Sequence, residues 1–375
     1  MNPFIYDDPV PPAELIDREL ELRRLLELAE GGHNTRLQAP RRYGKTSVLG
    51  KLCRLAEEGG FRTVYVDFLL ATTPAEVARR IEEAYVPALE GPLGQMFNRM
   101  RRGWRGRVKA TPGGVGGELE YAGGSDVMQR LADLLDLPQK VLEATGERTI
   151  VVFDEFQDFL RAEGELDGLL RSKIQHHGDA ASYVFSGSEQ ALLEEYFNSR
   201  RRPLFDQARP IYLEPLGDAE LGDYVTSRFG MTGKDPGEAL DLLLDLARGH
   251  PQRAMLLAHH LWECTAAGET ATQDTIDRAL EQVDRETKER FEGTWQAIAG
   301  TANKRRTLKA LALSNETLYN QRTLRRFKLS KSQAQSGERG LIAEGEVIRV
   351  DGRALIVDPL LERWIQVHDS GASAA

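Results

Sequence analysis

A phosphate-binding turn is the first stretch of this sequence whose residue types could do chemistry. The segment APRRYGKTS, residues 39–47, lies between a short apolar run and an amphipathic helix. Backbone N–H groups at such a helix start attract anions, Lys45 adds a charge for the outer phosphates, and the Thr46 hydroxyl is a ligand for Mg²⁺. The spacing matches G-x-x-x-x-G-K-[ST] except that Ala39 replaces the first glycine, a change that a negative φ would tolerate. The predicted nucleotide-contacting residues are Pro40, Arg41, Arg42, Tyr43, Gly44, Lys45, Thr46 and Ser47.

Two adjacent carboxylates supply the second half of this chemistry. In TIVVFDEFQDF, an apolar strand ends at Asp154 and Glu155. Ligands of open α/β sheets bind at the carboxyl ends of the strands. We expect Asp154 to hold Mg²⁺ and Glu155 to polarise the water that attacks the terminal phosphate of ATP. An acidic helix cap would explain two acids but not their position after a buried strand downstream of GKT.

Further polar residues follow the next strand. In SYVFSGSEQ, Ser186 would lie beside the terminal phosphate, although the serines could instead cap the next helix, with Ser188 the better suited to that role. Arg202, in a run of three arginines, could reach the phosphates of a neighbouring subunit, and Arg209 could serve its own chain. The alternative for each arginine is a solvated surface.

The elements around these residues alternate between strands and helices. We expect strands near 36–39, 61–68, 149–153, 182–186 and 210–213, and helices near 16–32, 45–58, 74–85, 125–144, 165–177 and 189–197. Asp17 is the expected cap of the first helix. Residues 91–124 interrupt this rhythm and indicate a basic inserted hairpin or loop. The alternation predicts an α/β fold with a mostly parallel sheet covered on both faces.

Three units are expected along the chain. Residues 1–216 form the ATPase core, 217–288 a helical lid, 289–369 a third unit, and 370–375 a disordered tail. In the third unit, GEVIRV and RALIVD are joined by Asp351 and Gly352, which is a strong hairpin signal.

Composition limits the class of protein. The chain has 375 residues, a net charge of -9 and two cysteines. These two cysteines are far apart and argue against a disulfide framework or a structural zinc site. No apolar stretch reaches the length of a membrane span, about 18 residues. We expect a cytoplasmic protein without a membrane partner.

A local basic cluster contrasts with this overall acidity. Between 304 and 331 the only acid is Glu316. Such asymmetry is the electrostatic footprint of DNA binding, and a helix from Ser330 onward could be its recognition helix, with the hairpin as the wing. Packing or a protein partner is the alternative. The expected DNA contacts are Arg322, Arg325, Arg326, Lys328, Lys331, Gln333 and Gln335; the basic insert around Trp104 is a second candidate for nucleic acid or a partner.

Several segments together resemble a known family. NPFIYDDPVPPAELIDRELEL, APRRYGKTS, VYVDF, VVFDEFQDF, FSGS, RPLFDQAR, GHPQR and IVDPLLERW occur in the order seen in the archaeal-type ATPases, a group of the STAND branch related to AAA+ proteins. The resemblance implies a P-loop sheet in 5-1-4-3-2 order, a helical lid and a C-terminal winged helix. It also implies that Arg18 lies in the segment lining the adenine pocket, with Phe4 and Val10 nearby, that His250 and Pro251 close over nucleotide, and that Arg253 senses it.

Three functions remain open at this point. The first is a slow ATPase with Mg²⁺ whose nucleotide state, ATP or ADP, switches the winged helix for regulation or defence signalling. The second is an oligomeric helper ATPase that loads or remodels DNA in replication or transposition. The third is a scaffold that retains ADP and offers its C-terminal unit to a protein partner.

Overall fold

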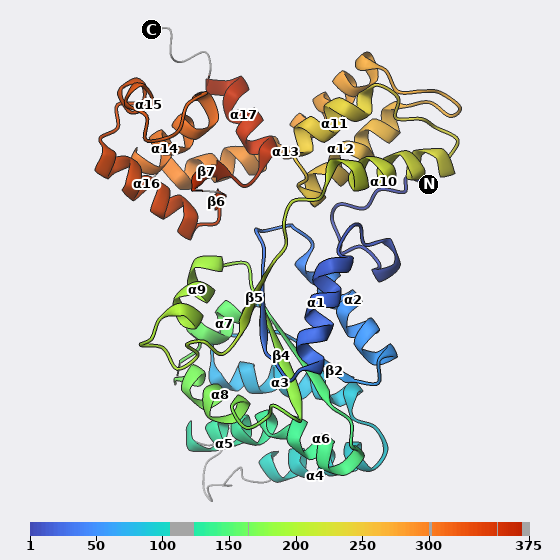
Figure 1. The fold of residues 1–375 in the computed structure, drawn as a ribbon, viewed down its shortest axis with the longest axis vertical. Coiled ribbons are helices and arrows are strands. Elements are labelled where there is room, and N and C mark those ends of the chain that lie inside the picture. The colour runs from blue at the N-terminus through green and yellow to red at the C-terminus, as the bar shows by residue number, and fades with distance from the viewer. Residues whose placement is uncertain (106–123, 164, 300–301, 351, 370–375) are drawn as a thin grey trace, which may run out of the picture.

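The computed structural model describes residues 1–105, 124–163, 165–299, 302–350 and 352–369. It shows a core below and two helical groups above it (Figure 1). Among the described helices, none combines the length and apolar character that a membrane span requires.

The core holds all five strands of one parallel sheet, in the order β2-β3-β4-β1-β5. This is the order that the resemblance implies, and the predicted α/β class is confirmed. In chain order the core elements are η1 (Pro12–Glu14), α1 (Glu19–Glu30), β1 (Thr35–Gln38), α2 (Lys45–Glu58), β2 (Arg62–Asp67), α3 (Pro74–Ala88), α4 (Gly91–Arg105), α5 (Gly124–Leu135), α6 (Leu137–Thr145), β3 (Thr149–Asp154), α7 (Phe156–Arg161), α8 (Leu166–Ile174), β4 (Ala181–Ser186), α9 (Gln190–Asn198) and β5 (Arg209–Tyr212).

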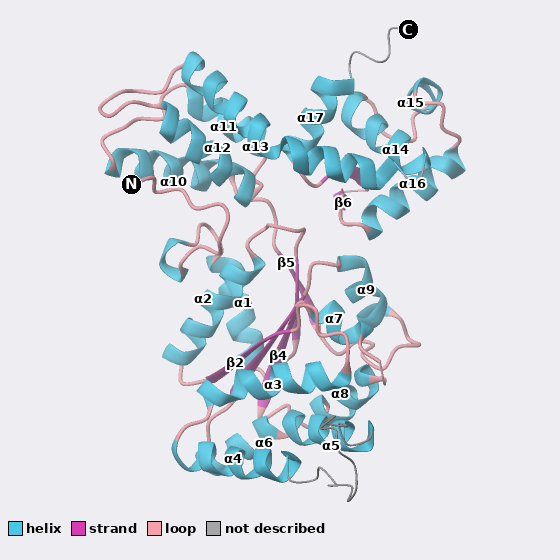
Figure 2. Cartoon of the chain, turned by 180° about the vertical axis from the view of Figure 1, so that it is seen from behind, coloured by secondary structure: helices cyan, strands magenta, loops and turns pink. Residues whose placement is uncertain are grey.

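Alternation along the strands divides the core into two layers. Ile150, Val152 and Val184 pack with α1 and α2 on one face, whereas Phe153 and Phe185 pack on the opposite face with α3 to α9. Figure 2 shows helices on both sides of the sheet. Because both faces are buried, the strands read as continuous apolar runs.

The lid and the C-terminal unit share one apolar core. Leu221, Leu257 and Val283 of the lid belong to the same buried cluster as Leu341 and Ile365 of the C-terminal unit. The elements are α10 (Asp218–Met231), α11 (Ala239–Ala247), α12 (Pro251–Cys264), α13 (Gln273–Ala299), α14 (Ala302–Leu313), α15 (Gln321–Arg326), α16 (Lys331–Ala343), β6 (Val347–Val350), β7 (Arg353–Ile356) and α17 (Pro359–Asp369). Helix α13 runs through the expected boundary at 288, so no break marks it, and the domain boundaries stay predictions.

The C-terminal unit contains the helices and hairpin predicted from its sequence. The Ser330 hydroxyl accepts a hydrogen bond from the Gln333 N–H, and a capping box starts α16 as predicted. Strands β6 and β7 pair antiparallel across Gly352, whose φ is 77°. Residue 351 and the tail at 370–375 lie outside the described residues.

Two local predictions are wrong, and one helix was not predicted. Residues 91–105 form α4 rather than a loop, because Leu93 and Phe97 are buried against the core. The remaining part of the insert, 106–123, lies outside the described residues. Helix α1 begins at Glu19 with Arg18 at its N-cap position, and Asp17, at φ 42°, does not cap it. Helix α7, directly after Glu155, was not expected.

Candidate nucleotide-binding site

The sheet brings the predicted catalytic residues to one edge and one face. Strands β1, β3 and β4 are parallel, so their carboxyl ends meet at the same edge. Val152 and Val184 point toward α2, and by alternation Asp154 and Ser186 share their face. Helix α2 begins with Lys45 directly after the turn that follows β1. The turn, the lysine and the carboxylates therefore lie together.

The turn between β1 and α2 has the backbone that its glycine predicts. Gly44 has a φ of 80° and precedes α2, and Arg42 also has a positive φ of 67°. Ala39 is buried and is not among the residues with positive φ, so alanine fits where the pattern has glycine. The free N–H groups of the first turn of α2 face this loop, which makes it suited to phosphate.

Lys45 is held at this turn by the loop itself. Its Nζ donates to the carbonyl oxygens of Ala39 and Pro40, each at 3.2 Å, and the side chain is buried. Burial lowers the pKa of Lys45, whereas Glu155 and Asp154 oppose that shift. A phosphate would give this ammonium a stronger acceptor than two carbonyls.

Asp154 is fixed by two donors. The Tyr65 hydroxyl donates to its Oδ2 at 2.5 Å, and the N–H of Glu155 donates to Oδ1 at 3.0 Å. Burial, and then Asp154, raise the pKa of Tyr65, so the phenol stays protonated and remains a donor. The carboxylate therefore keeps one orientation at the end of β3.

Glu155 is fixed on one oxygen only. Its Oε2 accepts from the Ser188 hydroxyl at 2.9 Å and from the Gln157 amide. Within the part of the chain that the structure describes, Oε1 has no hydrogen-bond partner, and Glu155 lines the cavity described below. Ser188 is thus not the cap of α9, which begins at Gln190 without a side-chain cap. That prediction is wrong because the N-cap position of α9 falls one residue later, on Glu189.

Ser186 carries a fully buried hydroxyl that has no hydrogen-bond partner among the residues that the structure describes. An orphaned buried hydroxyl of this kind calls for an acceptor such as a phosphate oxygen or a water. Its position beside β1 in the sheet suits the role predicted from the sequence.

The residues fit Mg²⁺ by their chemistry. Thr46 and Asp154 offer a hydroxyl and a carboxylate, the hard oxygen ligands that Mg²⁺ prefers, with phosphate oxygens and water completing its shell. Within the described ranges, no group of three or more His, Cys, Asp or Glu side chains could hold a metal. When bound, Mg²⁺ would neutralise charge on the transferred phosphate.

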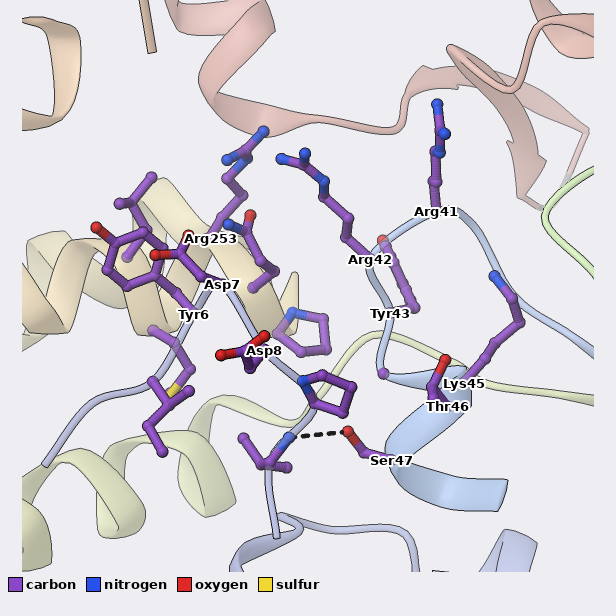
Figure 3. Close-up of a pocket in the computed structure, with 18 of the residues that line it drawn as sticks. Tyr6, Asp7, Asp8, Arg41, Arg42, Tyr43, Lys45, Thr46, Ser47 and Arg253 are labelled. Carbon is purple, nitrogen blue, oxygen red and sulfur yellow. Dashed lines mark hydrogen bonds between the residues drawn. The ribbon is translucent and has the colours of Figure 1, made fainter. Parts of the chain in front are cut away.

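A cavity of about 430 Å³ joins this edge to the lid and the N-terminal segment. Its size is typical of small-molecule sites. Asp7, Asp8 and Val10 form one wall, the phosphate loop forms another, and Pro251 and Arg253 close it from the lid (Figure 3). The N–H of Val10 donates to the Ser47 hydroxyl at 3.1 Å, which ties the N-terminal segment to α2.

The N-terminal segment also binds the lid. Phe4 is buried in the lid core beside Phe229, and its carbonyl accepts from His259 Nδ1 at 2.9 Å if that nitrogen is protonated. The Tyr6 hydroxyl donates to Glu286 at 3.2 Å. Val10 is among the described residues that line the cavity and Phe4 is not; the expectation that this segment lies near the adenine stays a prediction.

Arg18 and the lid residues that were predicted to contact nucleotide differ in how directly they face this cavity. Arg18 lines it, but its guanidinium is held by Glu21 at 3.0 Å and by the carbonyl of Glu214 at 2.8 Å. His250 caps α12 by accepting from the Arg253 N–H at 3.3 Å, and its ring packs on Tyr43 at 4.8 Å. Burial lowers the pKa of His250 to about 4, so the ring is neutral at pH 7.

Arg202 and Arg209, the two arginines predicted to reach the phosphates, are not among the described residues that line this cavity. Arg209 pairs with Thr35 at the first residues of β5 and β1, which is the opposite end of the sheet from the phosphate loop. The prediction that it serves its own chain is wrong, because strand direction places it there. Arg202 is half-buried, ion-paired with Glu195, and its guanidinium lies over the Tyr196 ring. A role across a subunit boundary stays a prediction for Arg202.

The basic residues of the C-terminal unit that were predicted to contact DNA are all exposed. Arg322, Arg325, Arg326, Lys328, Lys331 and Gln335 are exposed, and Gln333 is half-buried within the capping box. Arg305 and Lys309 instead lie over the Trp295 ring. The exposed set therefore gathers on α15 and the start of α16.

The basic insert is less available for binding a nucleic acid or a partner than its sequence suggests. Arg101 pairs with buried Glu82, and the Trp104 indole donates to Asp133 at 3.1 Å. Arg107 and Lys109 lie outside the described residues. The described part of this insert is thus packed against α3 and α5.

Glu346, in the turn between α16 and β6, has a strongly raised pKa. Burial raises its pKa to about 7, Asp358 and Glu344 add to the shift, and Arg41 opposes it. The Glu346 carboxyl loses its proton at a lower pH in the unfolded chain than in the folded one. This group therefore lowers the free energy of unfolding as pH rises from about 4.5 to 7, and the destabilisation stays constant above that range. The full shift corresponds to about 3 kcal/mol, and because the group is only half-buried we expect about 1–2 kcal/mol.

Glu346→Gln is therefore expected to be more stable than the wild type at pH 8 by about 1–2 kcal/mol and nearly equal at pH 4.5. Denaturant unfolding at both pH values measures this. A stability difference that does not change between pH 4.5 and pH 8 would contradict it.

Several residues of the site were missed in the sequence. Tyr65 and Gln157 orient the carboxylates, and Asp358 reaches the lid arginine Arg253. Each lay inside a quoted segment, VYVDF, VVFDEFQDF or IVDPLLERW, so the signal was present, but pairing between distant segments is not readable from one sequence.

Solved structures of similar fold include ATPases. No protein-family model and no curated protein sequence matches the chain. The Walker-type ATPase of Pyrococcus abyssi is similar with a TM-score of 0.68 and 18% identity, over 96% of this chain and 100% of that chain. The ORC2 protein of Aeropyrum pernix, in its ADPNP-ADP complexes, is similar with a TM-score of 0.56 and 16% identity, over 97% of this chain and 96% of that chain. At these identities the likeness shows the fold, which is that of the P-loop ATPases; assignment to the STAND branch stays a prediction.

Proposed function

We propose that this chain binds and hydrolyses ATP and uses the cycle to load or remodel double-stranded DNA. The observation that carries the ATPase part is the cavity that unites the phosphate loop, Glu155 and the lid. The similar ORC2 protein was solved with ADPNP and ADP, which supports a nucleotide as the occupant here.

In this proposal the phosphates lie on the first turn of α2 beside Lys45. Glu155, with Oε2 held by Ser188 and Gln157, uses Oε1 to orient the attacking water. Ser186 offers its unpartnered hydroxyl to the terminal phosphate. Arg18, Arg41–Ser47, Pro251 and Arg253 line the proposed ATP site. Pro40 holds Lys45 through its carbonyl, and His250 packs on Tyr43.

The DNA part of the proposal is supported by the exposed basic residues on α15 and the start of α16. Arginines and lysines on a small helical unit with a hairpin suit the phosphates of a duplex. Assembly into a homo-oligomer, with Arg202 acting across the boundary, belongs to the same proposal.

A nucleotide-controlled switch is the second candidate function. The shared apolar core of lid and C-terminal unit, with the ion pair of Arg248 and Glu362 at 2.8 Å, favours it because lid motion would move that unit. Regulation or defence signalling would then be the output.

Duplex binding by the full chain tests the DNA part. Arg325→Ala/Arg326→Ala is expected to lower the salt slope of binding by about 2 and to abolish DNA-stimulated ATP turnover, because two phosphate contacts are lost. Fluorescence anisotropy over a salt series and phosphate release measure this, with Arg278→Ala/Arg285→Ala on the exposed face of α13 as the control of equal charge change. DNA binding that ignores salt, or that survives the first double variant, would overturn the DNA part; steady ATP turnover without any DNA effect would favour the switch.

A further inference from the structure

A second cavity lies at the phosphate end of the first and reaches the C-terminal unit. It measures about 450 Å³. Arginines enter it from the phosphate loop and the lid, and carboxylates enter it from the C-terminal unit: Arg41, Arg42, Arg253 and Arg290 face Glu344, Glu346 and Asp358. Opposite charges from three parts of the chain therefore meet beside the proposed nucleotide.

Asp358 is the centre of this charge network. Its Oδ1 accepts from Arg253 Nε at 2.8 Å, and its Oδ2 accepts from Arg253 Nη2 and, at 3.4 Å, from Arg290 Nη2. Oδ1 also accepts from the N–H groups of Leu360 at 3.1 Å and Leu361 at 3.3 Å. One carboxylate thus starts α17 and holds two lid arginines.

Arg253 keeps one edge free. The residue is 1% exposed, and its Nη1 is buried and has no hydrogen-bond partner in the described part of the chain. Arg253 lines both cavities, and Figure 3 shows its guanidinium on the same side of the loop as that of Arg42. A guanidinium can bind two anions on two edges, so a carboxylate on one edge leaves the other for a phosphate.

We infer that Asp358 is a positioning residue of the nucleotide site, which holds Arg253 so that Nη1 faces the phosphates. This rests on the proposed ATP binding. The C-terminal unit then completes the site without touching nucleotide itself. The reason is geometric: an arginine side chain has many rotamers, and the bidentate pair fixes one of them before the phosphate arrives.

A purely structural ion pair is the alternative explanation. It would stabilise the contact between lid and C-terminal unit but would leave nucleotide affinity unchanged. Glu362, one turn further along α17, offers the matched control because it pairs with Arg248 of the lid at 2.8 Å and does not line either cavity.

Asp358→Asn tests the inference. Asparagine caps helices as well as aspartate, so α17 keeps its start while the charge that holds Arg253 is removed. Titration of a non-hydrolysable ATP analogue is expected to show about tenfold weaker binding to Asp358→Asn and unchanged binding to Glu362→Gln. Thermal unfolding of both variants checks that the fold is kept.

A double-mutant cycle with Arg253→Gln separates the two explanations. If Asp358 acts through Arg253, adding Asp358→Asn to Arg253→Gln weakens binding far less than it does in the wild type. Equal affinity of Asp358→Asn and Glu362→Gln, or fully additive losses in the cycle, would overturn the inference while leaving ATP binding in place. Absence of any analogue binding by the wild type would instead overturn the proposed function.

Discussion

Glu155→Gln is expected to lower ATP turnover by at least about 100-fold while ATP still binds. A positioned carboxylate that takes up a proton contributes about 10²–10⁴-fold to such reactions. Glutamine matches the shape of the side chain, and its amide oxygen can accept from Ser188 and Gln157 as Oε2 does. The amide cannot accept the proton of the attacking water, so the chemical step alone should fail.

Phosphate release and analogue titration measure the two effects separately. Asp158→Asn is the matched control, because Asp158 lies on α7, which directly follows Glu155, and accepts from the Leu70 N–H at 2.8 Å, a bond that asparagine retains. Lys45→Ala, by contrast, should lose binding and turnover together, since the lysine belongs to the phosphate loop. Unchanged turnover in Glu155→Gln would show that hydrolysis does not proceed through this carboxylate.

The α/β core was predictable because its signals are local. Strands buried on both faces read as apolar runs, as in Ile150–Phe153, and α2 has the predicted bounds from Lys45 to Glu58 because a glycine turn precedes it and Gly59 follows it. The same logic failed at 91–105, where glycines and arginines suggested a loop. There, burial of Leu93 and Phe97 overrides the local preference.

The candidate site was predictable only where a single sequence segment indicates both the functional residue and the structural element that carries it. GKT and the carboxylates after β3 are such segments, and the parallel sheet brings them together. Arg209 was misplaced although its position in the sequence held the answer. It precedes the strand predicted at 210–213, and in a parallel sheet the start of a strand lies at the edge opposite the carboxyl ends, as the pairing with Thr35 shows. Contacts between units, such as Arg253 with Asp358, depend on how three parts of the chain pack and carry no spacing signal.

The second large expected effect is on stability, and it concerns Gly249 in the turn between α11 and α12. Gly249 has a φ of 69°, and a Cβ there would lie 2.4 Å from the carbonyl oxygen of Leu216 and 2.8 Å from Pro215 Cβ. Its own carbonyl accepts from the Leu216 N–H at 2.8 Å, which joins the end of the core to the lid. Backbone atoms cannot move aside as a flexible side chain can, so alanine at position 249 should force apart the chain segments at Leu216 and Gly249.

Gly249→Ala is expected to lower the free energy of unfolding by about 2–4 kcal/mol, of which left-handed strain supplies about 1–2 kcal/mol and overpacking the rest. Gly233→Ala isolates the first contribution, because Gly233 has a φ of 72° and nothing within 4 Å of the added carbon. Denaturant unfolding of the two variants gives the difference. Equal losses would show that the chain segments at Leu216 and Gly249 separate without cost, and the lid would then not be fixed to the core at this point. A larger loss in Gly249→Ala, together with weaker nucleotide binding, would identify this close contact as what holds the lid over the phosphate loop.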